Sequence, residues 1–226
     1  MKQAASPPGV LVAFEGIDGS GKTTQLRLAL QWLRGQQCRA VPSEWSSSEL
    51  VMGATVRGKN RRLLTPTTFS LVHATDFADR YERQILPMLK GGCIVLADRY
   101  IFTSFARDGV RGCNPDWLRK LYSFARLPDL TFFFDLPLHT AIGRTLDSRM
   151  ELEYFDAGMD LELSMDIVES YRLYQGRILE FYRQMALPHR FVAIDGSASI
   201  HAQQMEIRRH IEQTLQLSRF RRRAAS

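Results

Sequence analysis

A glycine-rich stretch, Gly16-Ile17-Asp18-Gly19-Ser20-Gly21-Lys22-Thr23, has the residue types and spacing to bind the phosphates of a nucleotide. It fits Gly-x-x-x-x-Gly-Lys-Thr, in which glycines let backbone N–H groups converge on a phosphate. Lys22 would bridge the β- and γ-phosphates, and the Thr23 hydroxyl would be a magnesium ligand. Glycines at 16, 19 and 21 do not fit the Gly-x-Gly-x-x-Gly of dinucleotide sites. The stretch predicts ATP and Mg²⁺ as cofactors.

Two further residues extend this chemistry. Asp98 ends the apolar run Cys93-Ile94-Val95-Leu96-Ala97, and a strand beside a phosphate loop delivers an acid close to the metal. A helix cap is the alternative for this carboxylate. Arg99 would point into the same crevice and grip phosphate as a two-pronged donor. The residues expected to hold the nucleotide are Gly16, Asp18, Gly19, Ser20, Gly21, Lys22, Thr23 and Thr24, with Thr23 and Asp98 at the metal.

The elements that must position these groups follow from the hydrophobic pattern. Apolar runs at 10–14, 93–97 and 130–134 predict buried parallel strands, a weaker strand is expected near 39–41, and a last strand is expected at 191–194. Helical spacing follows the glycine-rich stretch from Lys22 to Gly35. A long helix is expected from an N-cap at Thr65 towards Lys90, and four more helices are expected at 116–125, 140–149, 166–185 and 205–215. Alternating strands and helices predict a three-layer α/β fold with a parallel sheet.

Length and composition bound the class of protein. The 226 residues, 45% of them hydrophobic, suit one domain. We expect a leader at 1–9, a domain at 10–217 and a basic tail at 218–226. The net charge of +6 resides largely in the runs at 57–62 and 219–223, so nucleic acid is not expected as a partner. Three scattered cysteines and the lack of a long apolar run predict a cytoplasmic protein without a membrane anchor.

The chain resembles the thymidylate kinase family. The residues that carry the resemblance are 14–25, from Phe14 to Gln25, Asp98-Arg99-Tyr100, Ala78-Asp79-Arg80, Pro128-Asp129-Leu130 and Ile194-Asp195-Gly196. The resemblance implies a P-loop NTPase fold with a five-stranded parallel sheet, a lid at about 146–166, and a homodimer packed through helices such as the long one. It also implies that Asp18 lies near the acceptor sugar and that Arg80 binds the acceptor phosphate. The implied acceptor is a nucleoside monophosphate, with dTMP as its leading member.

Departures from the family gather where the acceptor base would lie. Asp76 stands where the family has a stacking phenylalanine, and the stretch after the second strand keeps only the acid Glu44. We therefore expect a polar acceptor pocket, while a surface set of salt bridges remains the alternative. The pocket residues expected are Asp76, Arg80, Arg107, Asp108 and Arg111, with Asp18, Glu44 and Arg99 also on the acceptor. Another small phosphorylated or hydroxylated metabolite, or a non-catalytic ATP-binding regulatory role, stays open.

The predicted lid is unusually acidic. Six acids and no base occur between Glu151 and Asp166, and position 20 of the phosphate loop is serine rather than arginine. Charge on the migrating phosphoryl group must then be neutralised by another cation, which contributes roughly 10³–10⁵ in rate in P-loop enzymes. Arg149 and Arg144 are the candidate catalytic arginines, with Arg172 or Arg177 behind them.

Overall fold

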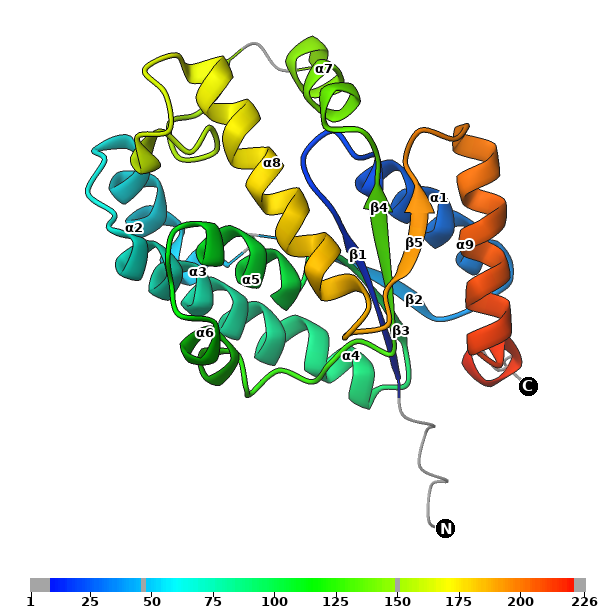
Figure 1. Cartoon of the computed structure of the whole chain (residues 1–226). Helices are drawn as coiled ribbons and strands as arrows, with labels where there is room; N and C mark the ends of the chain where they lie inside the picture. Colours follow the sequence, from blue (N-terminus) through cyan, green and yellow to red (C-terminus); the bar gives the residue numbers. More distant parts are fainter. Residues whose placement is uncertain (1–8, 46–47, 149–150, 222–226) are drawn as a thin grey trace.

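The computed structural model describes residues 9–45, 48–148 and 151–221, and Figure 1 shows their arrangement. Strand β1 (Val10–Glu15) is buried and leads through the glycine-rich loop into helix α1 (Lys22–Gly35). Leu26, Ala29 and Leu33 form the buried stripe of this helix, as its spacing predicts. The strand-loop-helix unit that a phosphate loop requires is therefore present.

The predicted sheet is confirmed: it has five strands, all parallel, in the order β2-β3-β1-β4-β5. The other four strands are β2 (Ala40–Glu44), β3 (Ile94–Asp98), β4 (Leu130–Asp135) and β5 (Val192–Asp195). In the register Phe14 faces Asp98, and Glu44 faces the same residue from the other side. Because parallel strands end at one edge, these acids gather beside the phosphate loop.

Helices cover both faces of the sheet (Figure 1). One face packs against α1 and α9 (Ile200–Thr214) through Leu30, Phe132 and Ile207. The other face packs against α3 (Pro66–Arg80), π-helical turn η1 (Tyr81–Ile85), α4 (Leu86–Lys90), α5 (Ile101–Val110) and α8 (Ile167–Ala186). The remaining helical segments are α2 (Glu49–Asn60), α6 (Pro115–Leu121), α7 (Leu138–Ser148), η2 (Met159–Leu161) and η3 (Leu217–Phe220). The three-layer α/β prediction is confirmed.

Two helices were not predicted, and the long helix is interrupted. Helix α2 has one buried residue, Gly58, so it lacks the apolar stripe that reveals a helix in sequence. Helix α5 is short, and none of its residues is exposed, because polar side chains such as Thr103, Ser104 and Asp108 are buried along with the apolar ones. The capping box at Thr65 is present, but the run to Lys90 contains the π-helical turn η1 before Pro87.

The basic end of the chain begins with an ordered segment. Phe220 is buried in the core beneath α1, and its carbonyl accepts a hydrogen bond from the Arg39 N–H at 2.8 Å. The packed domain thus reaches a few residues beyond 217, the end that the sequence predicts for it. Among the described residues, no helix combines the length and apolar character needed to cross a membrane.

Candidate active site

The phosphate loop has the backbone geometry of an anion cradle. Gly19 and Gly21 have φ angles of 74° and 89°, in the left-handed region that favours glycine. A Cβ on Gly19 would meet the Ala141 carbonyl at 2.1 Å, whereas a Cβ on Gly21 would meet nothing within 4 Å. The loop therefore packs tightly against α7 on one side and leaves open space at Gly21, ahead of helix α1. The Ser20 hydroxyl is buried in this loop and has no hydrogen-bond partner among the described residues.

Lys22 is the cation of the loop. Its side chain is buried, and its Nζ donates to the Ile17 carbonyl at 3.3 Å. Burial lowers the pKa of Lys22 from 10.5 to about 8, with nearby Arg99 lowering it further and the Asp18 and Asp98 carboxylates opposing the shift. The buried ammonium has N–H donors that no described residue accepts from, so it is suited to bind a phosphate. The negative charge of the phosphate would compensate the buried positive charge.

Thr23 and Asp98 lie together at the start of α1 and the end of β3. The Thr23 hydroxyl donates to Asp98 Oδ2 at 2.6 Å. Hydroxyl and carboxylate oxygens are ligands that Mg²⁺ takes from proteins, with nucleotide phosphates and water filling its remaining positions. Within the described residues no cluster of three or more His, Cys, Asp or Glu could hold a metal alone. The pair therefore fits a magnesium ion that arrives with the nucleotide.

Arg99 and Asp18 form an ion pair at the mouth of the loop. Arg99 Nη1 also donates to the Gly16 carbonyl at 3.2 Å, and the Asp18 N–H donates to Gln175 Oε1 at 3.4 Å. These contacts join the phosphate loop to β3 and to α8. They place one cation and one anion where β1 and β3 end.

Two cavities meet at this ion pair. The first, beside the phosphate loop, is lined by Asp18, Gly19, Lys22, Thr23, Arg27, Glu44, Trp45, Asp98, Arg99, Thr145 and Ser148. The second, between α3, α5 and α8, has a volume of about 330 Å³ and is lined by residues that include Arg107, Phe155, Tyr174 and Tyr182. Asp18, Trp45 and Arg99 line both. Two ligands could thus bind side by side with their ends at Arg99.

Asp76 and Arg80 lie behind the second cavity rather than on its wall. Asp76 is buried, and its Oδ2 accepts from the Ser48 N–H at 3.0 Å. Arg80 is fully buried between the rings of Trp45 and Phe77, whose centroids lie 5.1 and 5.2 Å from its guanidinium carbon. Its Nε and Nη1 have no hydrogen-bond partner among the described residues, and burial lowers its pKa to about 10. In this structure Trp45 covers the arginine expected at the acceptor phosphate.

Of the remaining members of the predicted acceptor pocket, Asp108 and Arg111 are buried and Arg107 is half-buried, so they do not form a set of salt bridges on the surface. Arg107 is the one whose side chain lines the second cavity. Its Nε donates to Asp108 at 3.0 Å, and its guanidinium lies 4.7 Å from the Phe69 ring centre. Asp108 is fully buried and accepts from the Ser70 hydroxyl at 2.8 Å. These groups brace α5 against α3.

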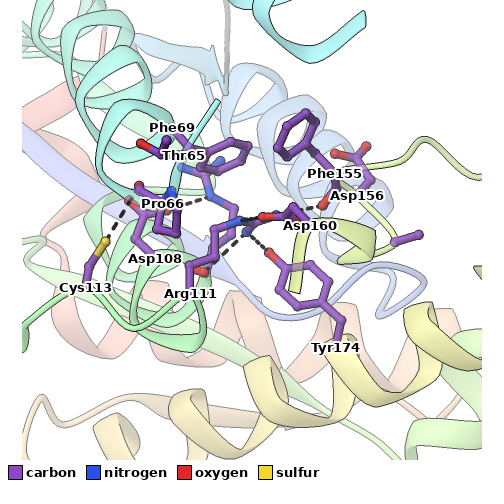
Figure 2. A network of polar contacts seen from close by, with 12 residues as sticks. Thr65, Pro66, Phe69, Asp108, Arg111, Cys113, Phe155, Asp156, Asp160 and Tyr174 are labelled. Carbon is purple, nitrogen blue, oxygen red and sulfur yellow. Dashed lines mark hydrogen bonds and ion pairs between the residues drawn. The ribbon is translucent and has the colours of Figure 1, made fainter. Parts of the chain in front are cut away.

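Arg111, at the end of α5, anchors the acidic segment that was expected to be a lid (Figure 2). Its guanidinium pairs with Asp160 at 2.8 Å, donates to the Phe155 carbonyl at 2.7 Å and contacts the Tyr174 hydroxyl. It also lies over the Phe69 ring at 4.0 Å. The segment therefore forms one wall of the second cavity, through Glu153, Phe155 and Asp156.

We expect Arg111→Met to lower the free energy of unfolding by about 3–5 kcal/mol, because removal of one partner leaves the Asp160 carboxylate and the Phe155 carbonyl without their buried donor. Urea denaturation followed by circular dichroism measures this. Adding Asp160→Leu should recover part of the loss. The matched control is Arg119→Met, whose partner Asp116 is exposed, and it should change little. Equal losses in the two single variants would contradict the prediction.

The predicted catalytic arginines of the lid are placed unequally. Arg144 is exposed on α7, and its Nη1 donates to the Gly196 carbonyl at 3.0 Å. Arg149 lies outside the described residues. Of the arginines behind the lid, Arg172 is exposed and pairs with Glu169 on its own helix. The catalytic use of these arginines remains a prediction.

Several residues that line the cavities were not singled out from the sequence. Trp45 follows β2 directly and lines the second cavity. The one signal in the sequence was an aromatic residue at the carboxyl end of a strand, where parallel sheets bind ligands. Phe155 lies in the acidic segment, and Tyr174 shares a helical stripe with core residues. Their positions along the chain gave no sign that these three side chains line one cavity. Thr24, expected at the nucleotide, is exposed in the first turn of α1.

The order of strands, the phosphate loop and the Thr23–Asp98 pair define the class of P-loop kinases, enzymes that transfer phosphate from ATP bound with Mg²⁺. Residues 14–207 match the family model described as thymidylate kinase. The chain is 42% identical over 202 residues to a probable thymidylate kinase 2 of Saccharolobus solfataricus, covering 89% of this chain and 94% of the relative. It is 30% identical over 216 residues to the thymidylate kinase of Symbiobacterium thermophilum, covering 91% and 94%. The chain belongs to the thymidylate kinase family, and it is a nucleoside monophosphate kinase with ATP and Mg²⁺ as cofactors.

Proposed function

We propose that this chain transfers the γ-phosphate of ATP to dTMP. The junction of the two cavities carries this proposal, because a donor on the phosphate loop and an acceptor in the second cavity would both end at Arg99. Relatives that match most of the chain are described as thymidylate kinases, which supports the acceptor. Transfer between two bound phosphates gains most of its rate from positioning and electrostatic stabilisation.

On the donor side, Lys22 and the loop amides would hold the β- and γ-phosphates, and the N-terminus of α1 adds positive potential. Thr23 and Asp98 would hold Mg²⁺, with Glu44 facing the same cavity. Held by these residues, the ion would supply positive charge beside the phosphate oxygens of the nucleotide.

On the acceptor side, Arg99 would hold the dTMP phosphate at the junction, with Asp18 turning from its ion pair towards the sugar. Arg80 has unused donors beneath Trp45, so a shift of this ring would bring a second cation to the phosphate. Arg107 would line the base end. Arg144 and Arg149 remain the candidates for neutralising charge on the moving phosphoryl group.

The test is release of ADP from ATP and Mg²⁺ in the presence of dTMP, dUMP, dCMP, dGMP, or small phosphorylated and hydroxylated metabolites. We expect dTMP to give the highest kcat/KM. Turnover only with a non-nucleotide acceptor would show that dTMP is not the substrate. ATP binding without acceptor-dependent turnover would indicate the regulatory role. A mixture of ATP and enzyme without acceptor supplies the background rate.

We infer that the protein is a cytoplasmic homodimer. Leu71 on α3 and Met88 on α4 are large apolar side chains exposed on the long helical run, where a second copy could cover them. Static light scattering should give twice the mass of one chain. A monomer at micromolar concentration would contradict the inference.

A further inference from the structure

His73 lies at the end of the acceptor cavity that is farther from the phosphate loop. This cavity shares Asp18, Trp45 and Arg99 with the phosphate-loop cavity, and it shares His73, Lys59 and Glu153 with a third cavity between α2 and α3. His73 therefore marks the opposite end from Arg99. If Arg99 holds the acceptor phosphate, the base of the same nucleotide extends towards His73.

The proton of the imidazole is fixed by its surroundings. His73 Nδ1 lies 2.8 Å from the Phe69 carbonyl oxygen, which can only accept, so Nδ1 carries the proton. Burial lowers the pKa of His73 well below its usual value, and Arg107, Lys59 and Arg111 lower it further. The ring is thus neutral at physiological pH, and Nε2 keeps a lone pair that can only accept.

No hydrogen-bond donor among the described residues uses that lone pair. The side chain is 3% exposed, and it lines the cavity. Its ring packs against Phe69 with 4.3 Å between centroids and a tilt of 36° between the planes, and Phe69 in turn stacks on Phe155 at 5.5 Å. The imidazole is therefore held in place by packing before any ligand arrives. A buried polar group on the wall of a cavity can select ligands, because leaving it unpaired beside a ligand costs free energy.

We propose that His73 is a specificity-determining residue, whose Nε2 accepts a hydrogen bond from the N3–H of the acceptor base. The proposal rests on the proposed function and deepens it. Thymine and uracil present a donor at N3 between two carbonyl oxygens, whereas cytosine presents a lone pair at N3. Two lone pairs facing each other in a desolvated site repel, so the same contact rejects dCMP. Arg107 offers only donors beside His73, and these suit the carbonyl oxygens of thymine.

The experiment compares dTMP, N3-methyl-dTMP and dCMP as acceptors for the wild type, His73→Phe and His73→Gln. Phenylalanine keeps a ring that packs against Phe69 but has no acceptor atom, and glutamine retains an oxygen that can accept. We expect His73→Phe to lower kcat/KM for dTMP by roughly 10–100-fold, mainly through KM, and to reduce the preference over N3-methyl-dTMP and dCMP by a similar factor. His73→Gln should retain part of both.

Controls separate this role from a structural one. His201→Phe makes the same change at an exposed position on α9 and should leave all three acceptors unaffected. Binding of ATP and Mg²⁺, measured by calorimetry, shows whether each variant is folded. If His73→Phe is not folded, the role of His73 is tested by His73→Gln and by the comparison of dTMP with N3-methyl-dTMP in the wild type. If the folded His73 variants turn over dTMP with the wild-type preference over N3-methyl-dTMP and dCMP, the role of His73 is overturned and the proposed function stands. An inactive wild type overturns the proposed function as well.

Discussion

Replacement of Lys22 by methionine is expected to lower kcat/KM by at least roughly 10²–10³-fold while it makes the folded protein more stable. The first effect follows because a positioned donor at the migrating charge contributes about this much to the rate. The second follows from burial, since Nζ contacts only the Ile17 carbonyl among the groups it could donate to in the described structure. Methionine has a similar volume and no charge to desolvate.

The pH dependence of stability gives the sign of this effect. The pKa of Lys22 falls from 10.5 in the unfolded chain to about 8 in the folded protein, so the charged form is disfavoured on folding. Below pH 8 both states are protonated and the full cost, about 3 kcal/mol, opposes folding. Between pH 8 and 10.5 the folded protein releases its proton first, and this cost disappears.

Urea denaturation without nucleotide at pH 7 and pH 10 measures the difference. The difference in unfolding free energy between Lys22→Met and the wild type should shrink as the pH rises. Only the wild type has the cost of burying a charged ammonium, and this cost disappears when Lys22 loses its proton. Lys120→Met is the matched control, since Lys120 is exposed on α6 and its removal should change neither the rate nor this pH trend. Equal stability of wild type and Lys22→Met at both pH values would show that the ammonium is well solvated.

The elements that hold the ATP phosphates could be predicted because their signals are local. The strand at 10–14, the glycines and Lys22 are contiguous, and Asp98 is found at the end of an unbroken apolar run. A strand of this kind and a glycine loop leave the backbone few choices. Fold class and donor site therefore followed from short stretches of sequence.

The acceptor side could not be predicted in the same way, because it depends on contacts between distant segments. Asp76 was expected to face the acceptor, but its carboxylate binds the Ser48 N–H ahead of α2, a helix without an apolar stripe. Burial raises the pKa of Asp76, and the contact with Ser48 opposes the shift. Arg111 was expected in the same pocket, but it pairs with an acid 49 residues away. Spacing within one helix cannot reveal such partners.

Arg99 has an unfavourable backbone conformation, and its side chain lies at the junction of the two cavities. Its φ is 66°, in the left-handed region, which costs a residue with a Cβ about 1–2 kcal/mol. Neighbours hold it there: the Arg99 N–H donates to the Phe14 carbonyl at 3.1 Å, and the next N–H, of Tyr100, donates to Glu15 at 2.8 Å. Glu15 is buried, and it also accepts from Thr103 at 2.7 Å. The strain therefore aims the guanidinium at the junction of the two cavities.

Arg99→Ala and Arg99→Gly should both lower kcat/KM for the acceptor by roughly 10²–10³-fold, because a charge-assisted contact to phosphate is lost together with the ion pair to Asp18. The two variants should differ in stability. Glycine adopts the left-handed region freely, so the free energy of unfolding of Arg99→Gly should exceed that of Arg99→Ala by about 1 kcal/mol.

Steady-state kinetics with ATP and dTMP varied in turn, and urea denaturation of the same preparations, measure both effects. The KM for dTMP should rise far more than the KM for ATP, since Lys22 and the loop amides remain in place. Arg99→Lys keeps a charge but not the planar pair of donors, so its rate should fall between wild type and alanine. If Arg99→Gly and Arg99→Ala are equally stable, the backbone at this turn stores no strain, and the guanidinium is positioned by its side-chain contacts with Asp18 and the Gly16 carbonyl.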